Sequence, residues 1–227
     1  MWNSGWDKIF EENEWGRYPP EELVRFVARN FYNVPDRRAV RALEVGSGTG
    51  ANLWYLAREG FDVTGIDGST AGAKRAIKRL ADEGLEADVK VGDIMSLPFE
   101  DNMFDCVIDN ECIYANSYKD SKKIMDEIFR VLKPNGKFYS RTFATGTYGD
   151  GNGRRLEGEK NTYLEIYSGA LRKGYGTIRF TDKDEIRDLY GKFVIESIDY
   201  VIRSVKGGAH EIKEWIIISC KADKTCG

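Results

Sequence analysis

The chain has 227 residues, of which 41% are hydrophobic and 31% are charged, and its formal net charge is −3. These values are typical of a globular protein, and the slight acidity gives no basic surface for nucleic acid or an anionic membrane. Four cysteines without C-x-x-C spacing and one histidine argue against a metal site, so we expect reduced thiols in a cytoplasmic protein. No stretch of about 18 apolar residues predicts a membrane span.

Apolar runs and helical patterns alternate along the first two thirds of the chain. We expect helices at residues 19–33, 49–59, 69–83 and 117–132, and strands at residues 41–45, 61–67, 87–92, 104–109 and 136–143. Alternation of this kind predicts a parallel sheet with helices wound on both faces.

The pattern changes after residue 143. Residues 144–178 hold eight glycines and several tyrosines but no long apolar period. Long segments of this kind are usually functional, so we expect a cap over the sheet rather than part of it. Its tyrosines are candidates for binding the substrate, namely Tyr148, Tyr163 and Tyr167.

A helix and two strands are expected at the C-terminal end. Thr181 is the expected N-cap of the helix, with Asp184 as the acid of its capping box. The loop between the strands contains Gly207 and Gly208, which favours an antiparallel hairpin. The expected bounds are 181–190 for the helix, and 193–202 and 214–220 for the strands.

These elements predict a fold of the α/β class. We expect a doubly wound, seven-stranded, mostly parallel sheet with a terminal antiparallel hairpin, an N-terminal helical lid and an inserted cap segment. The expected division of one domain over residues 1–227 is a lid or helix at 1–35, a core at 40–143, the cap at 144–178, and a C-terminal helix and hairpin at 179–227.

A glycine-rich run, GSGTGA at residues 46–51, follows the first strand and has two interpretations. As G-x-G-x-x-A it fits a dinucleotide fingerprint, in which a pyrophosphate sits on a helix N-terminus. As E-x-G-x-G-x-G, with Glu44 at its head, it fits a cofactor that carries no phosphate.

Acidic residues at the strand ends favour the second interpretation. Asp67 ends the second strand, 21 residues beyond Gly46, where a carboxylate can accept hydrogen bonds from both ribose hydroxyls. Asp93 ends the third strand, where it can accept a bond from an adenine amino group. Glu44 would repel a pyrophosphate, whereas it would attract the sulfonium and ammonium groups of S-adenosylmethionine.

Together these residues resemble class I, Rossmann-like S-adenosylmethionine-dependent methyltransferases, particularly the branch that acts on small molecules. The resemblance is close over residues 40–143, where FDCVID at 104–109 stands in register with the loop and the acids. It implies S-adenosyl-L-methionine as the cofactor, with Glu44 near its amino group, Asp67 on the ribose and Asp93 near the adenine. The residues that it assigns to the cofactor are Glu44, Gly46, Ser47, Gly48, Gly50, Asp67, Gly68, Ser69, Gly92, Asp93, Ile94 and Asn110.

The resemblance predicts a methyltransferase, and two absent motifs narrow its acceptor. DNEC at residues 109–112 replaces the [DNS]-P-P-[YFW] of amino-methylating DNA enzymes, and neither Cys106 nor Cys112 follows a proline, as a cytosine carbon-5 nucleophile does. We therefore expect transfer to an oxygen or nitrogen of a small molecule, with no nucleic acid, membrane or metal. The alternatives are a protein or RNA methyltransferase, a catalytically silent cofactor-binding protein, and a nicotinamide dehydrogenase, which Glu44 disfavours.

The N-terminal block is rich in aromatic residues, because Trp2, Trp6 and Trp15 are three of the five tryptophans. Aromatic faces attract a sulfonium cation, and a closed site excludes water, so we expect a lid. In it, Trp15, Arg17 and Tyr18 would contact the cofactor. Trp6 would contact the substrate, or alternatively would pack a helix onto the domain together with Trp2.

An acceptor hydroxyl or ammonium must lose a proton, which requires a base tuned towards neutral pH. Glu111 and Tyr114 follow the fourth strand and are candidates. His210, the only histidine, is the third candidate, because the hairpin loop should open at the carboxyl ends of the strands.

Overall fold

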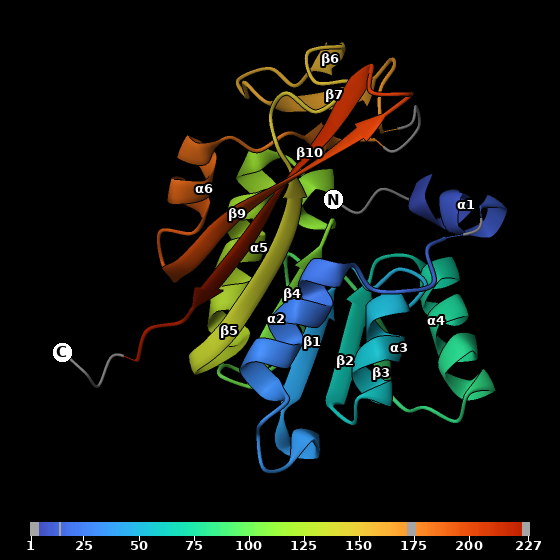
Figure 1. The fold of residues 1–227 in the computed structure, drawn as a ribbon, viewed down its shortest axis with the longest axis vertical. Helices are drawn as coiled ribbons and strands as arrows, with labels where there is room; N and C mark the ends of the chain where they lie inside the picture. Colours follow the sequence, from blue (N-terminus) through green and yellow to red (C-terminus); the bar gives the residue numbers. More distant parts are fainter. Residues whose placement is uncertain (1–4, 14, 172–175, 224–227) are drawn as a thin grey trace.

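The computed structural model describes residues 5–13, 15–171 and 176–223, and a seven-stranded sheet forms its centre (Figure 1). In spatial order its strands are β3 (Asp88–Val91), β2 (Asp62–Asp67), β1 (Arg41–Val45), β4 (Phe104–Asn110), β5 (Leu132–Phe143), β10 (His210–Cys220) and β9 (Val194–Val205). β10 is antiparallel to both of its neighbours, β5 and β9, and the other pairs are parallel. The predicted α/β fold with a mostly parallel sheet and a terminal hairpin is confirmed.

Helices cover both faces of the sheet. On one face lie α2 (Glu21–Phe31), α3 (Ala51–Arg58) and α4 (Thr70–Asp82), and on the other lie α5 (Tyr118–Val131) and α6 (Lys183–Leu189). Phe26, Leu53 and Ala76 belong to one buried apolar cluster, and Ile124 and Ile186 to a second cluster across the sheet. Within the described ranges, no helix is both long and apolar enough to cross a bilayer.

Serine side chains begin two of the helices. The Oγ of Ser69 accepts a bond from the Gly72 amide at 3.0 Å, and the Oγ of Ser117 accepts one from the Asp120 amide at the same distance. The predicted N-cap of α6 was wrong by one residue, because the cap is Asp182 in a capping box with Glu185. Thr181 stays extended, since its amide donates to the Phe143 carbonyl at 2.8 Å.

The N-terminal segment contains a helix, α1 (Gly5–Glu12), that packs on the start of α4. The Oδ1 of Asp7 accepts bonds from the Ser69 hydroxyl at 2.6 Å and from the Ala71 amide at 3.1 Å. The Arg75 guanidinium donates to the Asn13 carbonyl at 2.8 Å. Trp2 lies outside the described residues.

The cap forms a second, three-stranded antiparallel sheet, which we did not predict. Its strands are β6 (Gly153–Arg155), β7 (Thr162–Ile166) and β8 (Ile178–Arg179), and they lie above the carboxyl end of the main sheet in Figure 1. Tyr163, Ile166 and Phe180 form a buried cluster with Tyr114 and Phe143 of the core. Burial of these apolar side chains stabilises the cap against the core.

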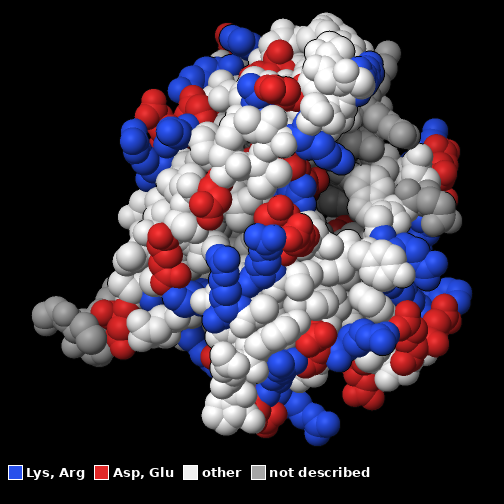
Figure 2. All heavy atoms as spheres, viewed as in Figure 1, with Lys and Arg blue, Asp and Glu red and all other residues white. Residues whose placement is uncertain are grey.

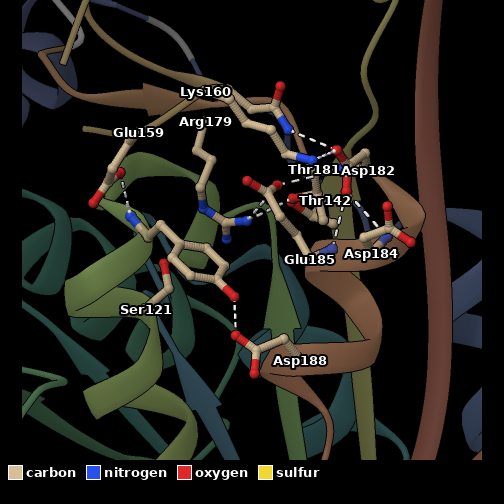
Figure 3. A network of polar contacts seen from close by, with 12 residues as sticks. Ser121, Thr142, Glu159, Lys160, Arg179, Thr181, Asp182, Asp184, Glu185 and Asp188 are labelled. Carbon is tan, nitrogen blue, oxygen red and sulfur yellow. Dashed lines mark hydrogen bonds and ion pairs between the residues drawn. The ribbon is translucent and has the colours of Figure 1, made fainter. Parts of the chain in front are cut away.

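A network of polar contacts joins the cap to the core (Figure 3). The buried Arg179 guanidinium donates to the Thr181 hydroxyl at 2.9 Å and lies 3.6 Å from the Glu185 carboxylate. The Glu159 carboxylate accepts bonds from the amides of Tyr118 and Lys119, at 2.7 and 3.2 Å. The cap therefore supplies a carboxylate to the N-terminus of α5, where negative charge is favourable.

The terminal hairpin is longer than predicted. Its turn occupies residues 206–209, and Lys206, Gly207 and Gly208 have positive φ angles of 52°, 67° and 89°. His210 was expected in a loop, but it is the first residue of β10 and pairs with Val205. Its backbone is therefore held by the sheet ladder.

Candidate functional site

A cavity of about 280 Å³ lies at the carboxyl ends of the central strands. Its walls come from the glycine loop, the ends of β1, β2 and β4, the N-terminal block, and the segment between β4 and α5. Ligands bind at this edge of open α/β sheets. The predicted residues that line it are Trp6, Trp15, Tyr18, Glu44, Gly46, Ser47, Gly48, Asp67, Gly68, Gly92, Asp93, Ile94, Asn110, Glu111 and Tyr114.

The loop glycines are required by the backbone and by packing. Gly46, Gly48 and Gly50 have φ angles of 68°, 49° and 79°, in the left-handed region that favours glycine. A Cβ at Gly46 would lie 2.1 Å from the Cys112 sulfur. Gly50 caps α3 against Ala76 and does not line the cavity.

Glu44 ends β1 beside the loop, and only 2% of its surface is exposed. Its Oε1 accepts a bond from the Asn52 side chain at 2.6 Å, whereas its Oε2 has no hydrogen-bond partner among the described residues. Burial, aided by the charges of Asp67 and Asp109, raises the pKa of Glu44 to about 8. The cavity therefore presents a buried carboxyl that a cation would stabilise in its charged form.

Asp67 ends β2 and holds the loop in place. Its Oδ2 accepts a bond from the Gly48 amide and its Oδ1 one from the Ser69 amide, each at 2.7 Å. Burial raises the pKa of Asp67. Ser69 is buried as the cap of α4 and does not line the cavity. Asp93 is exposed, and its Oδ1 accepts a bond from the Met95 amide at 2.9 Å.

A buried carboxylate shapes the turn after β4. The Oδ1 of Asp109 accepts bonds from the amides of Cys112 and Ile113, at 2.9 and 3.0 Å, and its Oδ2 accepts one from the Ser140 hydroxyl at 2.6 Å. These bonds hold the short 3₁₀ helix η2 (Ile113–Ala115), which carries Tyr114. Asp109 is therefore a structural residue that fixes one wall of the cavity.

Glu111 lies in that turn with a positive φ of 59°, which is uncommon for a residue other than glycine. Its carboxyl lies 3.2 Å from the Arg141 Nε and is hydrogen-bonded to the carboxyl of Glu214. Arg141 in turn lies 2.7 Å from Glu214 and 4.0 Å from Glu22. Burial and the Glu214 carboxyl raise the pKa of Glu111.

Aromatic rings form the N-terminal wall. The centroids of Trp6 and Phe10 are 5.7 Å apart, and Trp15 meets them edge-on at 6.2 and 5.3 Å. The Tyr18 ring packs edge-on against Trp54 at 5.6 Å. The predicted residue Arg17 does not line the cavity, and its carbonyl accepts a bond from the Arg79 guanidinium.

Four other predicted residues lie outside the cavity lining. The His210 ring stacks on Tyr148 with 3.7 Å between centroids. Tyr163 is 1% exposed because its ring fills the core of the cap, and its hydroxyl donates to the Asp150 carboxylate at 3.0 Å. Tyr167 is 59% exposed to solvent. The cap tyrosines and the histidine therefore do not meet the cofactor candidates.

Several lining residues were not predicted. Phe10 stands four residues after Trp6 at helical spacing, a signal that could have identified it. The others come from the N-terminal block, the glycine loop with the start of α3, the loop after β3, the segment from the end of β4 to the first turn of α5, and the cap. In the last two places the sequence gives no motif. They include Asn116, Ser117, Asp120 and Thr177.

Comparison with known proteins finds similarity to methyltransferases. Residues 43–140 match the family model described as Methyltransferase domain. Norajmaline N-methyltransferase of Rauvolfia serpentina is 32% identical over 127 residues, which are 55% of this chain and 42% of that protein. Demethylmenaquinone methyltransferase of Renibacterium salmoninarum is 35% identical over 109 residues, 48% of this chain and 44% of that protein. The match thus spans less than half the length of either relative.

The fold has a close counterpart among solved structures. A SAM-dependent methyltransferase from Methanosarcina mazei aligns with a TM-score of 0.71 and 22% identity, covering 90% of this chain and 99% of that chain. At this level of identity the likeness shows the fold.

Proposed function

Because residues 43–140 match a family model described as Methyltransferase domain, we propose that the chain is a class I S-adenosylmethionine-dependent methyltransferase that methylates an oxygen or nitrogen of a small molecule. The observation that carries this proposal is the Glu44 carboxyl at the head of the glycine loop. It is buried, lines the cavity and has one oxygen without a partner among the described residues. A cation satisfies such a group, whereas a pyrophosphate would be repelled by it.

The described side chains fit S-adenosylmethionine. Glu44 would hold the ammonium group, and the left-handed loop at Gly46 and Gly48 lets the methionine half approach bare backbone. Asp67 would bind the ribose hydroxyls, and Asp93, with Ile94 beside it, would bind the adenine. The cofactor supplies a methyl group on a positively charged sulfur.

The remaining task of the protein is to place the acceptor atom in line with that methyl group and to keep water out. Tyr114 and Glu111 face the cavity from the turn after β4, and Trp6, Phe10 and Trp15 close it from the N-terminal side. Glu111 is the carboxyl best placed to accept a proton from the acceptor, since His210 does not line the cavity. We accordingly assign the base to Glu111.

A small molecule is favoured over a nucleic acid or a protein as the acceptor. Acidic and basic side chains are mixed over the face shown in Figure 2, rather than gathered into one basic patch. The two curated relatives carry names of small-molecule methyltransferases. A catalytically silent cofactor-binding protein is the outcome if binding is found without transfer.

Calorimetric titration with S-adenosylhomocysteine and with NAD tests the proposal. We expect the first to bind and the second to give no measurable heat of binding. The cation should bring the pKa of Glu44 down from about 8, so binding near pH 7 should release a proton. Affinity should therefore rise as the pH is raised from 6 towards 8, and the heat should depend on the buffer. Binding of NAD alone would contradict the proposal.

A further inference from the structure

The cavity lining is acidic. Among the described residues that line it, Glu44, Asp67, Asp93, Glu111 and Asp120 carry carboxyl groups, and none is a lysine, arginine or histidine. A ligand with a net negative charge would therefore meet mainly charges of its own sign. This lining favours ligands that are neutral or positively charged.

The cofactor accounts for only part of this acidity. The proposed function assigns Glu44, Asp67 and Asp93 to S-adenosylmethionine. Glu111 belongs instead to the segment between β4 and α5, which also supplies Tyr114, and Asp120 lies in the first turn of α5. The cofactor does not need these two carboxyls. Each has a cation beside it outside the lining, since Arg141 lies 3.2 Å from Glu111 and Lys123 lies 3.1 Å from Asp120.

The charged groups around Glu111 have a net negative charge. Three carboxyls, those of Glu22, Glu111 and Glu214, surround the single guanidinium of Arg141. Glu214 is 2% exposed, and its carboxyl lies 2.7 Å from the same Arg141 guanidinium that lies 3.2 Å from Glu111. Because Glu111 and Glu214 share this guanidinium, the protonation of one carboxyl depends on that of the other.

We propose that the acceptor is a small amine that arrives as an ammonium ion, that Glu111 and Asp120 attract it, and that Glu111 accepts its proton. This inference rests on the proposed function and names the class of its substrate. The aromatic wall of Trp6, Phe10 and Trp15 adds favourable cation–π surface for the same charge. An oxygen acceptor would instead need a nearby cation to stabilise its oxyanion, and the described lining offers none.

The reaction balances in protons and electrons. One N–H proton of the ammonium passes to the Glu111 carboxylate, which leaves a neutral amine with a free electron pair. The nitrogen forms a bond to the methyl carbon as the carbon–sulfur bond breaks, and the pair of that bond stays on sulfur. The products are a methylated ammonium ion, a neutral thioether and a protonated Glu111, which loses its proton to solvent before the next turnover.

Methyl-labelled S-adenosylmethionine and three matched sets of small acceptors test the proposal: amines, alcohols with phenols, and carboxylic acids. We expect label in members of the amine set only. Glu111→Gln should lower the rate by ~100-fold or more, the effect of losing a general base. Affinity for S-adenosylhomocysteine should stay within about threefold, because binding and proton transfer use different carboxyls. Glu100→Gln, an exposed acid outside the cavity, should change neither quantity.

Label in oxygen acceptors, label in no amine, or amine transfer that is unaffected by Glu111→Gln would overturn the proposal. Failure to bind S-adenosylhomocysteine would instead count against the proposed function, so the two can be told apart.

Glu214 serves as a positioning residue, and a pH profile tests this role. Asp109, Arg141 and Glu214 all act on the pKa of Glu111, and Glu214 raises it. In Glu214→Gln that pKa should fall, so the limb on which activity rises with pH should move to lower pH. A variant that lowers activity at every pH without moving the limb would show a structural role only.

Discussion

The glycine-loop half of the molecule and the cap are built on different principles. Around the loop, the key residue types are required by the local backbone conformation. Gly46 and Gly48, for example, have φ angles of 68° and 49°. In the cap, β6 and β8 have three and two residues, and contacts between distant parts of the chain, such as that of the Glu159 carboxylate with the Tyr118 amide, hold the cap to the core. The first half is therefore specified locally, whereas the cap depends on side chains from distant parts of the chain.

This difference predicts that variants of the two halves will fail in different ways. A change near the loop should impair cofactor binding more than folding. A change in the polar network of Figure 3 should impair folding and leave the cofactor contacts intact.

Asp67→Ala should have the largest effect. It removes two charge-assisted bonds to the ribose, each worth ~1.5–3 kcal/mol, so affinity for S-adenosylhomocysteine should fall by ~100-fold or more. Calorimetry measures this loss, and thermal unfolding checks that the domain still folds. Asp62→Asn, at the exposed start of the same strand, is the matched control and should bind normally. Normal affinity in Asp67→Ala would refute the assigned ribose contact.

Glu185→Gln should destabilise the fold by ~3 kcal/mol, because it leaves the buried Arg179 guanidinium without its partner carboxylate. Urea unfolding measures the change. The neighbouring Asp184→Asn removes an exposed ion pair with Arg187 at 3.2 Å and should cost less than ~1 kcal/mol. If Glu185→Gln reduced the free energy of cofactor binding as much as the free energy of unfolding, the glycine-loop half and the cap would not be independent.

Trp15→Ala should weaken cofactor affinity by roughly tenfold, because it removes two edge-on contacts, with Trp6 and Phe10, worth ~0.5–1.5 kcal/mol each. Tyr167→Ala, an equally drastic change at an exposed site outside the cavity lining, is the control. Equal affinities of the two variants would argue that the N-terminal block is no lid.

His210→Ala should have the smallest effect. The ring stacks on Tyr148 away from the cavity lining, so kcat should stay within about twofold and the pH profile should keep its shape. A loss of ~100-fold with disappearance of the limb on which activity rises with pH would restore histidine as the base.

The sequence predicts those parts of the site that depend on local rules. Glycines at left-handed positions, acids at strand ends and serine caps such as Ser69 each follow from residue type and spacing. The fold could be predicted for the same reason, because alternating strands and helices leave few arrangements. The predicted bounds of β9 and β10 were short, since Arg203 and Ile212, which pair with each other, continue the ladder beyond them.

The rest of the site depends on contacts that no local pattern records. Tyr163 was expected to bind substrate, but an aromatic ring also fills a core well, and here it packs against Phe180 at 5.8 Å. The role of Glu214 depends on β10 lying beside β5, which brings its carboxyl to Arg141 across 73 residues of sequence. Only the assembled sheet places these groups together.

The seating of α1 sets the order in which ligands can enter and leave. Phe10 lies against Gly48 and Gly72, and the Asp7 carboxylate accepts hydrogen bonds from the start of α4. Helix α1 therefore covers the glycine loop that would hold the methionine half of the cofactor. We therefore expect S-adenosylmethionine to bind before the acceptor and its thioether product to leave last. The residence time of that product is then governed by how often α1 lifts, so weakening the contact at Asp7 should shorten it.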